Sequence, residues 1–316
     1  MKHPTCDFTL KNVHEVSNEI SCELTKGNAF SLIRLGDAEG LLMSVSNNSA
    51  DIDIKYFERH FGDHGRNLED LLSLRNRLMQ SIEGADFIGI RNDILDVTFD
   101  PNSLSLPRND FLEHARTNFR LRDAEKNLDY QGLRRIAFLH KSLSNLDLNN
   151  NKRFCSAWFQ FDYHNSGEIF RLLKQQDRIG LISCRSELPG MLEEMFEVSV
   201  KFHKIPDMFR DLSSELIVPD YINQLEDILS QRLVEFPGML YLIGAGLYGK
   251  LYCQLAKSQG GVALDLGSLL DAWVGIASRP TVYKSLYAME DETGLPTGLA
   301  LTLNNVNHLL QTQVGE

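Results

Sequence analysis

The sequence predicts an α/β fold with a mainly parallel sheet and helices on both faces. Apolar runs of strand length alternate with segments of helical periodicity along most of the chain, and Gly, Asp or Pro residues bound the runs. Such alternation is typical of strand–helix–strand units, in which helices cover both sides of a parallel sheet. The predicted strands are 30–35, 86–91, 154–161, 178–184, 198–205, 239–243 and 262–266.

Each of these apolar runs is shorter than a typical buried helix, which favours a strand. FSLIRL at 30–35 ends at a Gly-Asp pair, and MLYLI at 239–243 lies between Pro-Gly and Gly-Ala-Gly. Longer segments with helical spacing of apolar residues lie between the runs. The predicted helices are 66–83, 121–145, 165–176, 187–197, 219–235, 247–258 and 268–275.

The composition is that of a folded protein with an acidic balance. Of 316 residues, 43% are hydrophobic and 24% are charged, with 32 basic and 43 acidic residues and a net charge of −11. Nucleic acid is disfavoured as a partner, because a phosphate backbone binds clustered Lys and Arg. A small phosphate ligand remains compatible with this balance, since it needs only a local positive field.

Cysteine usage and hydropathy indicate the compartment. The five cysteines are scattered and never form a CxxC pair, so we expect a reduced, cytoplasmic chain. No apolar run approaches the roughly 18 residues of a membrane span, so any membrane association is expected to be peripheral. A homo-oligomer is compatible with the sequence.

The segment 31–40 (SLIRLGDAEG) is the first candidate site, because a strand ends there in Arg34, Gly36, Asp37 and Glu39. Ligands bind at strand ends in α/β proteins, and Mg²⁺ or Mn²⁺ commonly uses one or two carboxylates together with substrate phosphate oxygens. Arg34 could bind the same phosphates, and Gly36 lets the backbone approach closely. The alternative is helix capping, with Asp37 as N-cap of a helix that begins near Glu39.

A glycine-rich turn is the second candidate site. Gly244, Gly246 and Gly249 follow a strand and open a helix, where backbone amides favour an anion. Asp265 comes 19 residues after Gly246, at the end of the next strand, where a dinucleotide-binding fold keeps its ribose-binding acid. The alternatives are an NAD or S-adenosylmethionine site, a cradle for another nucleotide, or a turn used only for close packing.

Two arginines follow other predicted strands. Arg91 ends the strand 86–91, and Arg185 comes directly after the strand 178–184. A cation at either strand end suits a diphosphate. Cys184, beside Arg185, has no neighbour in sequence that would activate its thiol, so we expect a buried cysteine.

The two candidate segments, in this order, resemble the GT-D glycosyltransferases, a bacterial family first catalogued as a domain of unknown function. The resemblance rests on RxGDxE near the N-terminus and on IGAG…GGxAxDxGS near the C-terminus, and it covers roughly 28–95 and 178–280. It implies a single Rossmann-like catalytic domain. It also implies that Asp37 and Glu39 bind a divalent metal and the donor. Family members often have His where this chain has Ser268, which is expected near the donor.

The resemblance also bears on domain organisation. We expect one GT-D-like catalytic domain over 1–300, with a candidate seam at the Asn-rich stretch 146–152, and a polar tail over 301–316. An inverting transferase needs a general base for the acceptor hydroxyl. Asp271 and Glu187 are candidates, as is Asp265 if no ribose occupies it.

The function that these observations favour is a metal-dependent glycosyltransferase of the hexosyltransferase type. It would move a sugar from a nucleotide-diphosphate sugar, in the first place a UDP-sugar, to a glycan, glycoprotein or glycolipid acceptor, with Mn²⁺ or Mg²⁺ as cofactor. The alternatives are an NAD- or S-adenosylmethionine-dependent enzyme and a non-catalytic subunit that binds a nucleotide sugar.

Overall fold

Two compact units make up the chain. Unit 1 comprises Met1–Asn12 and Leu32–Trp158, and unit 2 comprises Val13–Ser31 and Phe159–Glu316. The expected seam at 146–152 and the expected tail at 301–316 lie outside the described residues. The computed structural model describes residues 10–46, 54–91, 101–118, 130–144, 153–207, 221–276 and 278.

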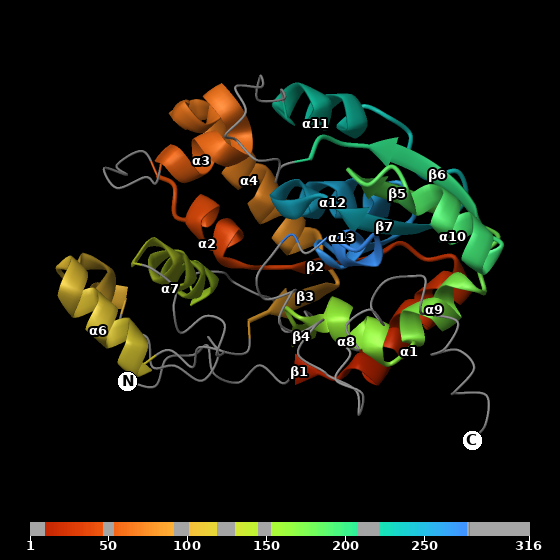
Figure 1. Ribbon diagram of the computed structural model, residues 1–316, viewed down its shortest axis with the longest axis horizontal. Coiled ribbons are helices and arrows are strands. Elements are labelled where there is room, and N and C mark those ends of the chain that lie inside the picture. The colour runs from red at the N-terminus through yellow and green to blue at the C-terminus, as the bar shows by residue number, and fades with distance from the viewer. Residues whose placement is uncertain are drawn as a thin grey trace. The chain divides into compact units, whose positions relative to one another are not determined.

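The strands of unit 1 have the order β1-β4-β3-β2, and neighbouring strands among them are parallel (Figure 1). Leu32 of β2 pairs with Phe87 of β3, and Ile88 of β3 pairs with Phe154 of β4. The expected strands at 30–35 and 86–91 are therefore confirmed. The strand bounds are β1 Leu10–Lys11, β2 Phe30–Arg34, β3 Phe87–Ile90 and β4 Arg153–Ser156.

Among the helices of unit 1, α4 begins at a side-chain N-cap. Asn67 precedes α4, and its side-chain oxygen accepts hydrogen bonds from the backbone N–H groups of Glu69 and Asp70. The helix expected at 66–83 is confirmed, while 121–129 of the expected helix 121–145 lies outside the described residues. The bounds are α2 Asp37–Met43, α3 Ile54–Phe61, η2 Gly62–Arg66, α4 Leu68–Gly84, η3 Pro101–Ser105, α6 Arg108–Asn118 and α7 Tyr130–Ser144.

Helices α2 and α7 pack in very close contact within unit 1. A Cβ atom at Gly40 would lie 2.4 Å from the Cβ of Leu139 and 2.5 Å from its backbone nitrogen. These neighbours belong to or lie next to the backbone, so they cannot move aside as a side-chain tip would. Gly40 therefore sets the distance between the two helices.

The strands of unit 2 have the order β8-β7-β5-β6, and neighbouring strands among them are also parallel. Ile179 of β5 lies between Leu240 of β7 and Val200 of β6, and Leu240 also pairs with Val262 of β8. Four expected strands are confirmed here, and with them the α/β fold with a parallel sheet. The bounds are β5 Arg178–Ser183, β6 Ser199–Lys204, β7 Leu240–Gly244 and β8 Val262–Asp265.

The N-terminal helix α1 belongs to unit 2, where it contacts α8, α9 and β8. Ser17 on α1 donates a hydrogen bond to the carboxylate of Glu168 at the start of α9. The helices expected at 187–197 and 247–258 are confirmed. The bounds are α1 Val13–Lys26, α8 Phe159–Asn165, α9 Glu168–Leu173, α10 Leu188–Phe196, α11 Tyr221–Leu229, η4 Gly246–Tyr248, α12 Gly249–Ser258 and α13 Leu269–Trp273.

The strand expected at 154–161 is correct only in its first part. β4 ends at Ser156, whose hydroxyl accepts a hydrogen bond from the backbone N–H of Trp158, and α8 begins at Phe159. Phe159 and Tyr163, one helical turn apart, stack with ring centroids 4.8 Å apart. Because Phe159, Phe161 and Tyr163 are all buried, the apolar run carries no periodicity that distinguishes a strand from a helix.

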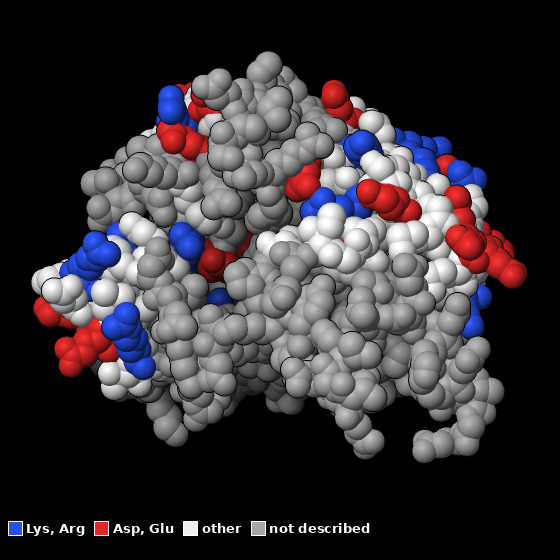
Figure 2. Space-filling view, viewed as in Figure 1, with Lys and Arg blue, Asp and Glu red and all other residues white. Residues whose placement is uncertain are grey.

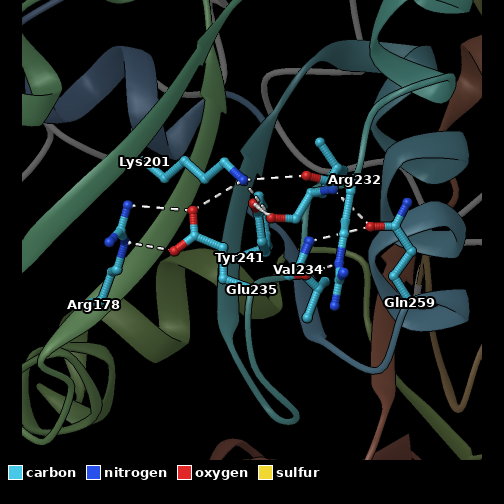
Figure 3. Close-up of polar contacts among 8 residues, drawn as sticks. Arg178, Lys201, Arg232, Val234, Glu235, Tyr241 and Gln259 are labelled. Atoms are coloured by element: carbon cyan, nitrogen blue, oxygen red, sulfur yellow. Dashed lines mark hydrogen bonds and ion pairs between the residues drawn. The ribbon is translucent and has the colours of Figure 1, made fainter.

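The loop before β7 is tied to the starts of the neighbouring strands by a polar network (Figure 3). Arg178, the first residue of β5, and Lys201 of β6 both form ion pairs with Glu235. The Tyr241 hydroxyl donates to the carbonyl of Leu233 at 2.6 Å. Backbone groups of the loop are thereby satisfied, and this polar cluster stands away from the strand ends that carry the candidate site residues.

The described surface mixes charges of both signs. On the face that Figure 2 shows, Lys and Arg side chains lie among Asp and Glu side chains over the described residues. Within the described parts of the chain, no helix combines the length and the apolar character that crossing a membrane requires.

Replacing Gly40 should destabilise the protein. We expect Gly40→Ala to lower the free energy of unfolding by about 1–3 kcal/mol, because the added methyl group overlaps the Leu139 backbone. Urea unfolding followed by circular dichroism measures this change.

The matched control is Gly190→Ala in α10, where a Cβ atom would meet nothing within 4 Å. This variant should gain about 0.5–1 kcal/mol, since alanine is the better helix former. Equal effects of the two substitutions would contradict the close packing of α2 on α7.

Candidate functional site

The carboxyl ends of β2, β3 and β4 carry the polar groups of the first candidate site, in unit 1. Arg34 is the last residue of β2, and its Nη1 donates a hydrogen bond to the carbonyl of Ala157, just after β4, at 3.2 Å. A Cβ atom at Gly89 would lie 2.9 Å from the Cγ of Arg34, so the glycine lets this side chain cross β3. Arg91 follows β3 and is 6% exposed. Parallel pairing thus brings Arg34 and Arg91 to one edge.

The carboxylate of Glu39 closes the first turn of α2. Its Oε2 accepts a hydrogen bond from the backbone N–H of Gly36 at 2.8 Å, and Gly36 is the N-cap. Asp37 is the first helical residue. The capping alternative is therefore observed in a different form, since Glu39 rather than Asp37 satisfies a backbone group at the helix start.

Asp37 lies beside a cation that the sequence analysis missed. Its Oδ2 is 3.4 Å from Nε of Arg135, which α7 supplies. The guanidinium of Arg135 stands 4.6 Å from the centroid of the Tyr56 ring in α3. Nothing in the sequence marks Arg135, because it is brought to Asp37 by the packing of α2 on α7 at Gly40.

The Asp37 and Glu39 carboxylates are groups of the kind that Mg²⁺ or Mn²⁺ takes as ligands. The Asp37 side chain is 30% exposed, so a ligand can reach it, and the Gly36 hydrogen bond orients the Glu39 carboxylate. Such cations take one or two carboxylates and complete their shell with water and substrate oxygens. Among the described residues, no group of three or more His, Cys, Asp or Glu side chains could hold a metal ion.

The glycine-rich turn of unit 2 joins β7 to the short helix η4. Gly246 has φ +53°, which favours glycine. A Cβ atom at Gly244 would lie 2.7 Å from Cδ1 of Leu270 in α13 and 3.1 Å from the carbonyl oxygen of Gly267. A Cβ atom at Gly249 would make only ordinary van der Waals contacts, the nearest at 3.5 Å. Close packing thus accounts for Gly244, and backbone geometry accounts for Gly246.

Asp265 is held in a buried ion pair. Its Oδ2 lies 3.0 Å from Nζ of Lys250, and the two side chains are 0% and 6% exposed. The same ammonium group donates to the carbonyl of Gly246 at 3.0 Å. Lys250 therefore links α12, β8 and the glycine turn. A role of Asp265 in binding ribose stays a prediction. In this structure its carboxylate forms an ion pair with Lys250.

Arg185 and Asp271, predicted for separate roles, lie in contact. Nε of Arg185 donates to Oδ1 of Asp271 at 2.6 Å, and Nη1 donates to Oδ2 of Asp207 at 2.6 Å. Burial lowers the pKa of Arg185, but the charge of Asp271 and the hydrogen bonds that the guanidinium donates to both carboxylates outweigh this effect and raise that pKa above its ordinary value. Sequence reasoning missed Asp207, although it follows β6 as the predicted residues follow their strands.

A cavity of about 290 Å³ opens beside this ion-paired cluster, within unit 2. Glu187 lines it, as do Arg185 and Cys184. Burial raises the pKa of the Cys184 thiol to about 11, so the sulfur is protonated at neutral pH. Ser268 precedes α13, and its carbonyl accepts a hydrogen bond from the Ala272 N–H. Its role near a donor stays a prediction.

A comparison with protein-family models identifies part of the chain. The model described as the GT-D fold-like domain matches residues 11–115. Residues 11–115 are therefore similar to the GT-D fold-like domain. The matched range includes Arg34, Asp37, Glu39 and Arg91, and the resemblance that the sequence suggested is confirmed.

Three solved structures show a likeness of fold to this chain. A structure of domain of unknown function 1792 has a TM-score of 0.50 and 13% identity, and the alignment covers 83% of this chain and 79% of that one. A second structure, described as a highly conserved domain with a distinct glycosyltransferase fold, has a TM-score of 0.48, 13% identity and the same coverages of 83% and 79%. A third, a new glycosyltransferase from Streptococcus sanguinis, has a TM-score of 0.43 and 17% identity, with 83% and 81% covered. None of the curated proteins compared with the chain matches it.

Removing the ammonium group of Lys250 should destabilise unit 2 strongly. We expect Lys250→Met to cost about 3–5 kcal/mol in the free energy of unfolding, because it leaves the Asp265 carboxylate buried without its cation. The double variant Lys250→Met/Asp265→Leu should recover much of this loss. Chemical unfolding of the three proteins measures both effects.

Lys257→Met, in the last turn of the same helix, is the matched control and should cost less than about 1 kcal/mol. A Lys250→Met protein as stable as the parent would contradict a buried ion pair between Lys250 and Asp265.

Cys184 should react slowly with alkylating agents at neutral pH. With a pKa of about 11, only about 0.1% of the thiol is ionised at pH 8, and the rate should rise about tenfold for each pH unit up to pH 10. Mass spectrometry after iodoacetamide treatment compares this rate with that of the exposed Cys22. Equal rates for Cys184 and Cys22 at pH 7.5 would contradict the raised pKa.

Proposed function

We propose that the chain is a metal-dependent glycosyltransferase. It transfers a sugar, a hexose by the family resemblance, from a nucleotide-diphosphate sugar to a glycan, glycoprotein or glycolipid acceptor. The observation that carries this proposal is the match of residues 11–115 to the GT-D fold-like domain, with Asp37 and Glu39 at the carboxyl end of β2 inside the matched range. The preferred donor is a UDP-sugar.

In this proposal, Asp37 and Glu39 hold Mn²⁺ or Mg²⁺. When bound, the cation supplies Lewis-acid stabilisation of the negative charge that develops on the diphosphate leaving group. The hydrogen bond from Gly36 keeps the Glu39 carboxylate in one orientation. Arg135 lies close to Asp37 and balances its negative charge when no substrate is present.

Arg34 and Arg91 are the proposed cationic groups for the donor phosphates in unit 1. The hydrogen bond to the Ala157 carbonyl holds the Arg34 side chain at the strand end. Gly89 leaves room for this side chain because it has no Cβ atom. A guanidinium fixed in this way loses little conformational entropy when it binds a phosphate. A guanidinium group binds phosphate oxygens through charge-assisted hydrogen bonds.

Glu187 is the better of the two proposed general bases. It lines the unit 2 cavity, whereas Asp271 is 8% exposed and has Oδ1 bound to Arg185. A general base has to reach the acceptor hydroxyl through a hydrogen bond. We therefore assign proton transfer to Glu187 and a positioning role to Asp271.

An enzyme that uses NAD or S-adenosylmethionine is the weaker alternative. That hypothesis needs the Asp265 carboxylate for a ribose, and this carboxylate is fully buried against Lys250. It also leaves Asp37 and Glu39 without a ligand. The non-catalytic subunit differs from the transferase in one respect, since it binds a donor but does not consume it.

Donor binding should depend on the metal. We expect one nucleotide sugar from a panel of UDP-, GDP- and other sugar donors to raise the melting temperature in Mn²⁺ but not in EDTA. A ligand at 100 times its Kd adds about 2.7 kcal/mol of stability, which a thermal-shift assay resolves. In Asp37→Asn this shift should disappear, and transfer should fall by about 100-fold or more.

Asp63→Asn is the control, because Asp63 is an exposed carboxylate of unit 1 outside α2. It should keep the full shift. Stabilisation by NAD⁺ or S-adenosylmethionine in EDTA, without any shift from a nucleotide sugar, would overturn the proposal.

A further inference from the structure

The cavity at the carboxyl ends of β5 and β6 has a lining that suits one class of ligand. Its volume is about 290 Å³, near the lower end of the roughly 300–1,000 Å³ range of small-ligand sites. The lining combines acidic, basic, hydroxyl, thiol and apolar groups. The residues are Cys184, Arg185, Ser186, Glu187, Lys204, Ile205, Pro206, Asp207 and Ile276.

The positive charge of Arg185, which lines this cavity, is balanced by two carboxylates. It is 7% exposed, and its Nε and Nη1 are bonded to Asp271 and Asp207. Among the described residues, its Nη2 has no hydrogen-bond partner. The guanidinium is therefore held rigidly, with one donor group left for a ligand and its charge already balanced by two carboxylates.

The charge of the site disfavours a phosphate. Within the described residues, two basic side chains, Arg185 and Lys204, face three carboxylates, namely Glu187, Asp207 and the Asp271 bonded to Arg185. A diphosphate here would meet a site that is negative overall, and like charges held together in an interface are costly. The donor-binding role predicted for Arg185 thus needs a ligand group other than phosphate.

A neutral polyhydroxylated ring matches the lining. Carboxylates accept hydrogen bonds from hydroxyls, while Nη2 of Arg185 can donate to a hydroxyl or ring oxygen. The lining also includes Pro206 and Ile276, and Ile276 is 40% exposed although it is a large apolar side chain. Such a surface can cover the C–H face of a sugar ring, which would otherwise stay in water.

We propose that this cavity is a monosaccharide subsite, in which Asp207 and Asp271 position Arg185 toward a sugar hydroxyl. The inference rests on the proposed function only for the source of the ring, which is either the sugar of the donor or the terminal sugar of the acceptor. Binding of the ring itself requires neither nucleotide nor metal.

The test measures the binding of simple sugars to the full chain in EDTA. Saturation-transfer NMR with methyl glycosides of glucose, galactose and N-acetylglucosamine gives a Kd for the best ligand. Ser186→Trp fills the cavity from an exposed position and leaves the Arg185 ion pairs intact, so it should raise this Kd at least tenfold with an unchanged melting temperature. Ser258→Trp, at the exposed end of α12, should leave it unchanged.

Asp207→Asn tests the positioning role separately. It should raise the glycoside Kd at least tenfold, whereas Asp227→Asn, which removes an exposed carboxylate of α11, should not. The Kd of UDP in Mn²⁺ should stay within twofold in Asp207→Asn. A general loss of fold would weaken the binding of both the glycoside and UDP, so a raised Kd for the glycoside alone indicates the positioning role.

Measuring the Kd of UDP and of a UDP-sugar in Mn²⁺ distinguishes the two sources of the ring, the donor and the acceptor. If the UDP-sugar binds more tightly than UDP and Ser186→Trp removes the difference, the donor sugar occupies the cavity. If the difference persists and the glycoside binds together with UDP, the acceptor occupies it. Either result supports the subsite.

Three results would overturn the subsite: glycosides that do not bind, glycosides that bind Ser186→Trp as well as the parent, or inorganic pyrophosphate that binds the parent but not Ser186→Trp. If glycosides bind as expected but no nucleotide sugar binds or is consumed, the subsite stands and the proposed transferase fails.

Discussion

Parallel strand pairing is the constraint on which the placement of the candidate residues depends. In a parallel sheet the carboxyl ends of neighbouring strands share one edge, so residues that follow different strands meet although they are far apart in sequence. In unit 1 this brings Arg34, the last residue of β2, into contact with the Ala157 carbonyl just after β4. In unit 2 it brings Arg185 after β5 to Asp207 after β6. Sites at these edges are a consequence of the fold.

The candidate site residues are fixed by partners of opposite charge or by backbone groups. Glu39 is bound by a backbone N–H, Asp265 by Lys250, and Arg185 by two carboxylates. Buried ionised groups need such partners, because an unpaired charge away from water is very costly. The same pairing orients each group, which favours binding when a ligand replaces water. Asp37 is the more exposed member of its pair, which suits a ligand that comes and goes.

The sequence was sufficient to predict strands β2, β3, β5, β6, β7 and β8 and the segments at their ends, but it did not predict the two-residue strand β1. Strand length and bounding glycines identified β2, β5, β7 and β8 because short apolar runs between turn residues leave few alternatives. The same reasoning failed at 154–161, where a run of buried aromatic residues continues from β4 into α8 without a change of pattern.

The partners of the site residues could not be predicted in the same way. Arg185 and Asp271 are 86 residues apart, and their contact depends on how β5 and α13 pack. Arg135 reaches Asp37 only because Gly40 allows α2 to approach α7 closely. Such pairs are set by tertiary packing, and a single sequence carries no periodic signal for them. Lys250 is the exception, since a lysine directly after the glycine turn is visible in the sequence.

The most direct measurement is the release of UDP from a nucleotide sugar by the full chain. A panel of UDP-sugars would be incubated with the protein and candidate acceptor glycosides, once with Mn²⁺ and once with EDTA, and UDP would be quantified. A glycosyltransferase whose cation is held by Asp37 and Glu39 should release UDP from one donor in Mn²⁺ and lose that activity in EDTA. Equal release with and without the cation would contradict the metal site, and no release from any nucleotide sugar would contradict the transferase.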